Sequence, residues 1–191
     1  MKKILCFCFY SFMLLSAAQA QSFSLSELKE QMIKDWKRAK AYTQEYLDAM
    51  PADKYGFRPA DSIRSFAEQM LHFAQANAGS AFIGTGVNNV AGQVFRRPDF
   101  AKLPAAQNKD SVMYYVNTSY DIMINAIKDM DFGKLGEEVS FDLPAPAGKR
   151  IATRLGWLLK AFEHQTHHRG QCTIYLRLQG VRPPAEKLWD L

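Results

Sequence analysis

The stretch AFEHQTHHRGQCTIYLRLQGVRPP, residues 161–184, carries three of the four histidines of the chain. We predict that it belongs to the longest helix of the chain, over about residues 151–179. Gly180 is well placed as the C-terminal cap of that helix, and two prolines at 183–184 follow directly. The other predicted elements are those that can pack against this helix.

Two further segments have apolar residues at helical spacing. Residues 24–50 form the first predicted helix, in which Ser24 and Glu27 have the spacing of a capping box. Pro51 disfavours helical geometry in the residue before it, which predicts the end of this helix. Residues 108–130 form the third predicted helix, with apolar side chains every three to four positions.

The second predicted helix starts after a turn-rich connection. Asp61 or Ser62 can cap it, and its apolar stripe runs from Ile63 to Ala81. Few charged side chains interrupt this segment, which predicts burial on more than one side.

The connections complete a single-domain arrangement. Residues 84–104 are rich in glycine and proline and are predicted to be mostly loop. Residues 131–148 hold one strand-like piece, 139–143, and a possible small hairpin. Four long amphipathic helices in a chain of this size predict an all-α four-helix bundle over residues 21–191.

The first 20 residues have the pattern of a secretory signal peptide. Lys2 and Lys3 precede an apolar run, which ends in small residues typical of a cleavage site. We expect export to the periplasm or the exterior, with no stable membrane anchor after cleavage; an uncleaved N-terminal anchor is the alternative. Cleavage removes Cys6 and Cys8, so the exported chain keeps Cys172 alone and has no internal disulfide.

The charge balance gives no reason to expect a nucleic-acid partner. The 191 residues contain 24 Lys and Arg against 19 Asp and Glu, a net charge of +5 that falls to +3 without the leader. The basic residues form no run longer than a pair. A cationic patch for phosphates is therefore not indicated.

Histidines are the candidate metal ligands. His164 and His168 are four residues apart and thus lie on one face of the predicted helix. His72 on the second helix is the third candidate, because facing helices of a bundle can bring three imidazoles to one point. Three protein ligands suit zinc, nickel, copper or iron and leave a position for water or substrate.

The alternative is that these histidines are ordinary core or surface residues. A His-x-x-x-His pair also arises by chance, and His72 lies about 100° past Leu71, off the main apolar stripe. The flank of His72 carries the small residues Ala76 and Gly79. That flank either borders a pocket or faces water.

Other polar residues near the histidines have two possible roles each. We predict that His167 is a proton shuttle or an exposed neighbour, because adjacent residues diverge too far to share one ion with His168. Glu68 either moves protons or orients His72, and Arg169 either holds an anionic substrate group or forms a salt bridge. Gln165 stands where a zincin peptidase needs glutamate, so that mechanism is not expected.

Two segments together resemble a known family. Residues 161–184 resemble the C-terminal helix of the DinB/YfiT-like superfamily of metal-binding four-helix bundles, whose H-x-x-x-H-R-G-Q motif supplies two metal ligands. Residues 65–78, SFAEQMLHFAQANA, resemble the second-helix motif of that superfamily, and His72 matches its third ligand. Residues 57–59, Phe-Arg-Pro, match the usual lead-in to that helix.

The resemblance implies a fold and a metal, but no single reaction. It implies an up-down-down-up bundle, often a homodimer, with a divalent ion, commonly zinc or nickel, held by His72, His164 and His168. We favour a metal-dependent hydrolase acting on a small molecule that the sequence does not identify. The alternatives are a metal-dependent thiol transferase, which export disfavours, and a non-catalytic metal-binding or stress protein of the envelope.

Overall fold

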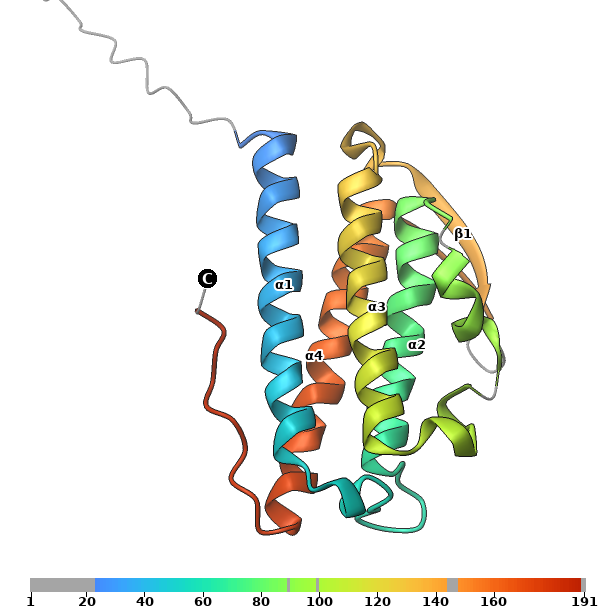
Figure 1. The fold of residues 1–191 in the computed structure, drawn as a ribbon. Helices are drawn as coiled ribbons and strands as arrows, with labels where there is room; N and C mark the ends of the chain where they lie inside the picture. Colours follow the sequence, from blue (N-terminus) through green and yellow to red (C-terminus); the bar gives the residue numbers. More distant parts are fainter. Residues whose placement is uncertain (1–22, 89, 99, 144–147, 190–191) are drawn as a thin grey trace, which may run out of the picture.

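The structure is a computed structural model of the chain, and it describes residues 23–88, 90–98, 100–143 and 148–189. The predicted leader, residues 1–20, lies outside these ranges. Four long helices form the bundle: α1 (Leu25–Ala49), α2 (Phe66–Thr85), α3 (Lys109–Asp129) and α4 (Arg154–Leu178) (Figure 1). In the described ranges, no helix is both long enough and apolar enough to span a membrane.

Polar contacts at both ends show that α1 and α3 run antiparallel. The Lys29 ammonium donates to the Met130 carbonyl at 3.0 Å. At the opposite end of the pair, the Lys109 ammonium donates to the Met50 carbonyl at 3.2 Å. The start of α1 therefore lies beside the end of α3.

By the same reasoning, α1 and α4 run parallel. The Arg169 guanidinium donates to the Ala39 carbonyl at 3.4 Å. Further toward the C-terminal ends of both helices, the Tyr46 and Thr173 hydroxyls lie 3.1 Å apart. Residue numbers thus rise together along the two helices.

Helix α2 runs antiparallel to α4. Near the end of α2, a side chain added at Gly84 would meet Leu158 at 3.0 Å, so the lack of a side chain lets the helices approach closely. Near its start, the Gln69 amide donates to Gln171. Together with the other two pairs, this gives the up-down-down-up order that the family resemblance implied.

The start of α2 differs from the prediction. Ser65, rather than Asp61 or Ser62, caps the helix, and its hydroxyl accepts from the Glu68 amide at 3.1 Å. The Glu68 carboxylate accepts from the Ser65 amide at 3.0 Å, which completes a capping box. Ile63 lies before the helix and is 42% exposed, so it is not part of the apolar stripe.

The start of α4 also differs from the prediction. The helix begins at Arg154 with Thr153 as its cap, three residues later than expected, because residues 148–153 form a strand instead. As a result α4 has 25 residues, the same length as α1, and is not the longest helix. Gly180 follows its end with a φ of 71°, the left-handed geometry expected there.

The fold is mostly helical and not purely all-α as predicted, because it also contains a two-stranded sheet. Strands β1 (Glu138–Leu143) and β2 (Gly148–Thr153) pair antiparallel, which confirms the predicted small hairpin. The Trp157 indole nitrogen donates to the Val139 carbonyl at 3.3 Å and thereby fastens the hairpin to α4.

The connection from α2 to α3 is more regular than the predicted loop. It contains three short 3₁₀ helices, η2 (Val90–Arg96), η3 (Phe100–Lys102) and η4 (Pro104–Ala106). The Gln75 amide donates to the Phe95 carbonyl at 2.9 Å and so holds this connection against α2.

Two further features lie around α1. Short 3₁₀ helices follow α1 and α3, namely η1 (Ala52–Lys54) and η5 (Phe132–Lys134). The C-terminal segment runs back along α1 (Figure 1), where Lys187 forms an ion pair with Glu45 and its carbonyl accepts from Arg38 at 3.2 Å.

Candidate metal centre

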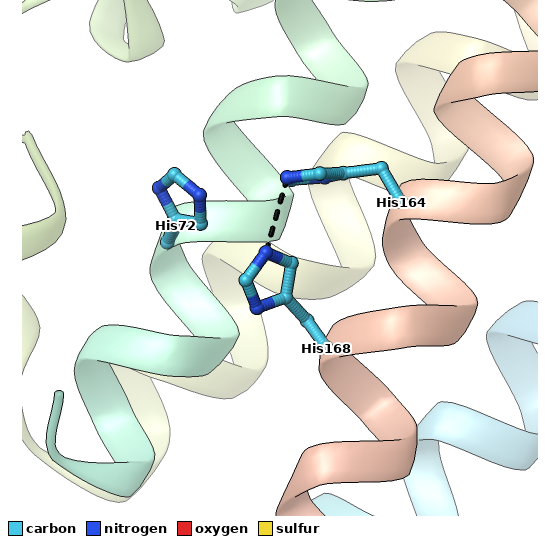
Figure 2. Close-up of side chains that lie close together, drawn as sticks. All are labelled: His72, His164 and His168. Atoms are coloured by element: carbon cyan, nitrogen blue, oxygen red, sulfur yellow. Dashed lines mark hydrogen bonds between the residues drawn. The ribbon is translucent and has the colours of Figure 1, made fainter. Parts of the chain in front are cut away.

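The three predicted ligands converge between α2 and α4. His72 approaches from α2, and His164 and His168 from successive turns of α4 (Figure 2). One ring nitrogen from each lies within 4.8 Å of the others, and the ring of His72 is centred 5.2 Å from His164 and 4.7 Å from His168. The predicted cluster is therefore present in the fold.

Hydrogen bonds fix which nitrogen of His168 faces the cluster. Its Nδ1 lies 3.2 Å from the Gln69 carbonyl oxygen, while the Gln69 amide group donates to Gln171. Because the oxygen of Gln69 can only accept, this network assigns the proton of His168 to Nδ1. The lone pair on Nε2 is then free for a metal ion, as in other sites where a second residue orients the ligand.

The geometry of His164 fits a metal site as well. Its Nε2 lies 3.0 Å from Nε2 of His168, close to the separation of about 3.3 Å that two ligands of a tetrahedral zinc ion have. Its Nδ1 is buried and has no hydrogen-bond partner among the described residues. The nitrogen of His164 that faces the cluster is therefore Nε2, the same atom as in His168.

All three imidazoles are neutral near pH 7. Burial, with a smaller contribution from the positive charge of Arg64, lowers the pKa of His72 to about 4. Burial also lowers the pKa of His168 to about 3, with smaller contributions from the neighbouring histidines. The pKa of His164 is lowered by burial too. Neutral imidazole is the form that binds divalent metals.

Two cavities border the cluster. His72 and His164 both line a cavity of about 950 Å³ between α2, α4 and the segments that cross them. His72 also lines a second cavity of about 330 Å³. The three histidines therefore leave one side open to a ligand, which a purely structural metal site does not need.

The small residues beside His72 form part of this opening. Ala76 and Gly79 line the larger cavity, and a side chain added at Gly79 would meet no atom within 4 Å. The flank of His72 therefore borders a pocket, one of the two outcomes that the sequence left open.

Glu68 occupies a structural position at the edge of the smaller cavity. Its carboxylate accepts from the Arg58 guanidinium as well as from the Ser65 amide. Burial alone would raise the pKa of Glu68, but these hydrogen bonds outweigh it and lower the pKa. Its carboxylate is thus ionised and engaged in the helix cap, and no hydrogen bond joins it to His72 in the described residues.

His167 stands at the surface beside the ligands. Its ring is exposed and centred 5.0 Å from that of His168. The Gln171 amide nitrogen lies 2.9 Å from Nε2 of His167. A chain of hydrogen bonds therefore connects His167, Gln171, Gln69 and His168.

Arg169 lies inside the bundle and lines neither cavity. It is 3% exposed, and its guanidinium donates to Thr43 and Gln165 and stacks 4.6 Å from the Tyr42 ring. In the described residues it has no carboxylate within salt-bridge distance. The structure thus gives Arg169 a packing role, in place of the substrate contact or salt bridge considered from the sequence.

Gln69 contributes to the site although the sequence pattern did not indicate it. This residue is one turn before His72 on α2 and 5% exposed, and it bridges the two helices at the site. The sequence signal that could have indicated it is an amide side chain at helical spacing from a candidate ligand.

The comparisons with known proteins agree with this geometry. A model of the DinB superfamily matches residues 35–172. A DinB-like protein from Bacillus cereus superposes with a TM-score of 0.65 at 19% identity, covering 83% of this chain and 97% of that one. A DinB-like protein from Bacillus subtilis gives 0.58 at 19% identity, covering 78% and 92%. A search of curated proteins finds no match.

The fold and the site together define a four-helix bundle with a three-histidine cluster suited to a divalent metal. The family match spans most of the chain and includes all three histidines. The protein belongs to the DinB superfamily.

Proposed function

We propose that this protein is a metal-dependent hydrolase, with His72, His164 and His168 as the ligands of one divalent ion, zinc or nickel. The observation that carries the proposal is the open side of the cluster, where two of the three histidines form part of a cavity wall. A cavity lined by metal ligands and apolar side chains is the usual form of a small-molecule site.

The metal would supply Lewis acidity to a carbonyl or phosphoryl oxygen and would lower the pKa of a bound water. The chain's own residues prepare the site. Gln69 holds His168 with its Nε2 toward the other ligands, and Gln171 holds Gln69 in turn. Neutral imidazoles leave the positive charge of the ion undiminished by carboxylate ligands.

Among the three residues predicted to assist, His167 is the best placed to move protons. Its ring is exposed to solvent and centred 5.0 Å from that of His168. Glu68 is tied to a helix cap and to Arg58, and Arg169 is buried elsewhere. We therefore assign proton transfer to His167 and give Glu68 and Arg169 structural roles.

Metal content tests the ligand assignment. We expect about one divalent ion per purified chain, loss of that ion in His164→Ala and His72→Ala, and retention in His167→Ala. The last variant is the matched control, since it removes an exposed histidine from the same helix. Stoichiometric metal in His164→Ala would contradict the assignment.

Activity separates the hydrolase from the alternatives. We expect the metal-loaded protein to hydrolyse activated esters or amides, the chelated protein to be inactive, and added metal to restore the rate. Turnover of thiol adducts without hydrolysis would instead favour a transferase. Full metal occupancy without turnover on either panel would favour a non-catalytic envelope protein.

Export is a separate part of the proposal. We propose that residues 1–20 direct the chain to the periplasm or the exterior and are then removed. The expected result is a chain that begins at Gln21 when its N-terminus is sequenced from the exported fraction. An intact N-terminus in the cytoplasmic fraction would refute export.

A further inference from the structure

The larger cavity is built for an apolar group. Ile83 and Ile122 contribute aliphatic walls, while Phe95, Phe141 and Trp157 contribute aromatic ones. These residues come from α2, α3, α4, β1 and the crossing segment, so several elements enclose the space. At about 950 Å³ the cavity is far larger than a metal-bound water requires.

The smaller cavity has the opposite character. Arg64 and Lys102 line it with exposed side chains, and among the described residues Glu68 is the one carboxylate that lines it. Arg58 already forms an ion pair with that carboxylate. Two cations therefore face one carboxylate among the described lining residues, and Arg58 shares that carboxylate, so the cavity carries excess positive charge that favours an anionic group.

The histidine cluster lies where the two cavities meet. His72, Gln75 and Pro98 line both of them, and His164 lines the larger. A molecule that fills both cavities would thus pass beside the metal ligands.

We propose that the ligand of this site is an amphiphilic anion, with an apolar acyl or aryl body in the larger cavity and an anionic group between Arg64 and Lys102. The proposal deepens the proposed function, because it names the substrate class of the same site. The junction between the apolar and anionic parts then lies beside His72.

Two other cations compete for the anionic group. Arg96 lines the larger cavity, but its guanidinium is 5.2 Å from the Phe82 ring and donates to Asn88 at 3.3 Å. Lys160 is a single exposed lysine at the same cavity. The contacts of Arg96 hold its guanidinium in place without removing its charge, so the larger cavity is the alternative site for the anion, and Lys160 serves as the comparison in the test.

The test uses octanoate and 1-octanol, which share an apolar chain and differ in charge. Calorimetry on protein stripped of metal by a chelator excludes carboxylate binding to the ion. We expect octanoate to bind about fivefold or more tightly than octanol, and acetate not to bind. Equal affinity for octanoate and octanol would overturn the anionic part of the proposal.

A substitution that fills the larger cavity tests the apolar part. Gly79→Phe places a ring in the cavity and replaces a glycine inside a helix, so the fold is expected to stay intact. We expect both ligands to bind about tenfold more weakly or not at all. Gly170→Phe is the matched control, an exposed glycine of α4 that lines neither cavity, and should bind both ligands normally. Normal binding to Gly79→Phe would overturn the proposal.

A charge substitution locates the anionic group. The double variant Arg64→Ala/Lys102→Ala should lose about fivefold in octanoate affinity and keep its octanol affinity, while Lys160→Ala should change neither. A loss confined to Lys160→Ala would place the anion in the larger cavity and overturn this assignment.

These results are independent of the metal assignment. Ligand binding is measured without metal, and metal content is measured without ligand. Loss of metal from His164→Ala together with no binding of octanoate would leave the proposed metal centre intact and refute the substrate class alone.

Discussion

Two polar stripes lie on neighbouring faces of α4, one formed by Gln165 and Arg169 and the other by His164 and His168. They differ in their surroundings. Gln165 and Arg169 face the middle of the bundle, where the Gln165 carbonyl oxygen accepts from the Tyr120 hydroxyl at 2.8 Å and from Arg169 at 2.9 Å. Thr43 adds a hydroxyl 2.7 Å from that of Tyr120. This closed network of buried polar groups is satisfied within the protein.

The neighbouring stripe of His164 and His168 is open. Nδ1 of His164 has no hydrogen-bond partner among the described residues, and His164 lines a cavity of about 950 Å³. His168 is held by Gln69 with its second nitrogen toward His164. The difference between the stripes is that the first is enclosed and satisfied within the protein, whereas the second brings imidazole nitrogens together at the wall of a cavity, which indicates a ligand site.

The closed network should show the larger effect on folding. In Gln165→Leu, the Tyr120 hydroxyl and the buried Arg169 guanidinium lose their shared acceptor, so the free energy of unfolding should fall by about 3 kcal/mol. Urea denaturation of the metal-free protein measures this, and metal content should not change. Glu163→Leu, an exposed position on the same helix, should change stability by less than about 0.5 kcal/mol. A loss below about 1 kcal/mol in Gln165→Leu would remove the contrast between the stripes.

The open stripe should affect stability only through its ligand. Zinc at about 100 times its Kd should raise the free energy of unfolding of the wild type by about 2.7 kcal/mol. His164→Leu should abolish this gain, yet stay within about 1 kcal/mol of the wild type when both are metal-free, because leucine removes one contact with His168 together with a buried Nδ1 that has no partner among the described residues. Thermal unfolding with and without zinc measures both effects. A large loss in metal-free His164→Leu would mean that this stripe is also structural.

The sequence predicted the features that depend on local pattern. Helical spacing predicted four helices, and the Ser24–Glu27 pair predicted the first helix start, which the structure confirms with a full capping box. The three histidines were predicted from two separated motifs, and the structure brings them together.

The features that depend on distant contacts were not predicted. Ser65, and not Asp61 or Ser62, caps α2. The helix begins there because the backbone amides of Phe66 and Ala67 donate to the carbonyls of residues 57 and 55, at 3.0 and 2.9 Å. The start of α4 moved because residues 148–153 pair with β1. The two cavities depend on where the crossing segment and the hairpin pack, which no local pattern specifies.

The residue that orients the open stripe should have a smaller effect than a ligand. Gln69→Ala removes the acceptor for Nδ1 of His168, and metal affinity should fall about 10- to 100-fold. Gln171→Ala acts one bond further away and should cost less. Competition with a chromogenic chelator measures both affinities. Gln75→Ala is the control, because Gln75 lies on the same helix but bonds the crossing segment instead; an equal loss there would mean that the effect of Gln69→Ala is not specific.

The smallest expected effect comes from a single hydroxyl of the closed network. Burial raises the pKa of Tyr120 to about 12, so its hydroxyl is protonated near pH 7 and donates to Gln165. Tyr120→Phe removes that donor but leaves Gln165 bound to Arg169, so the loss should be about 1 kcal/mol, with metal affinity unchanged. Urea denaturation and chelator competition on one preparation measure the two quantities. A change in metal affinity would show that the two stripes are coupled through α4, and that the separation between a structural and a ligand-binding stripe is incomplete.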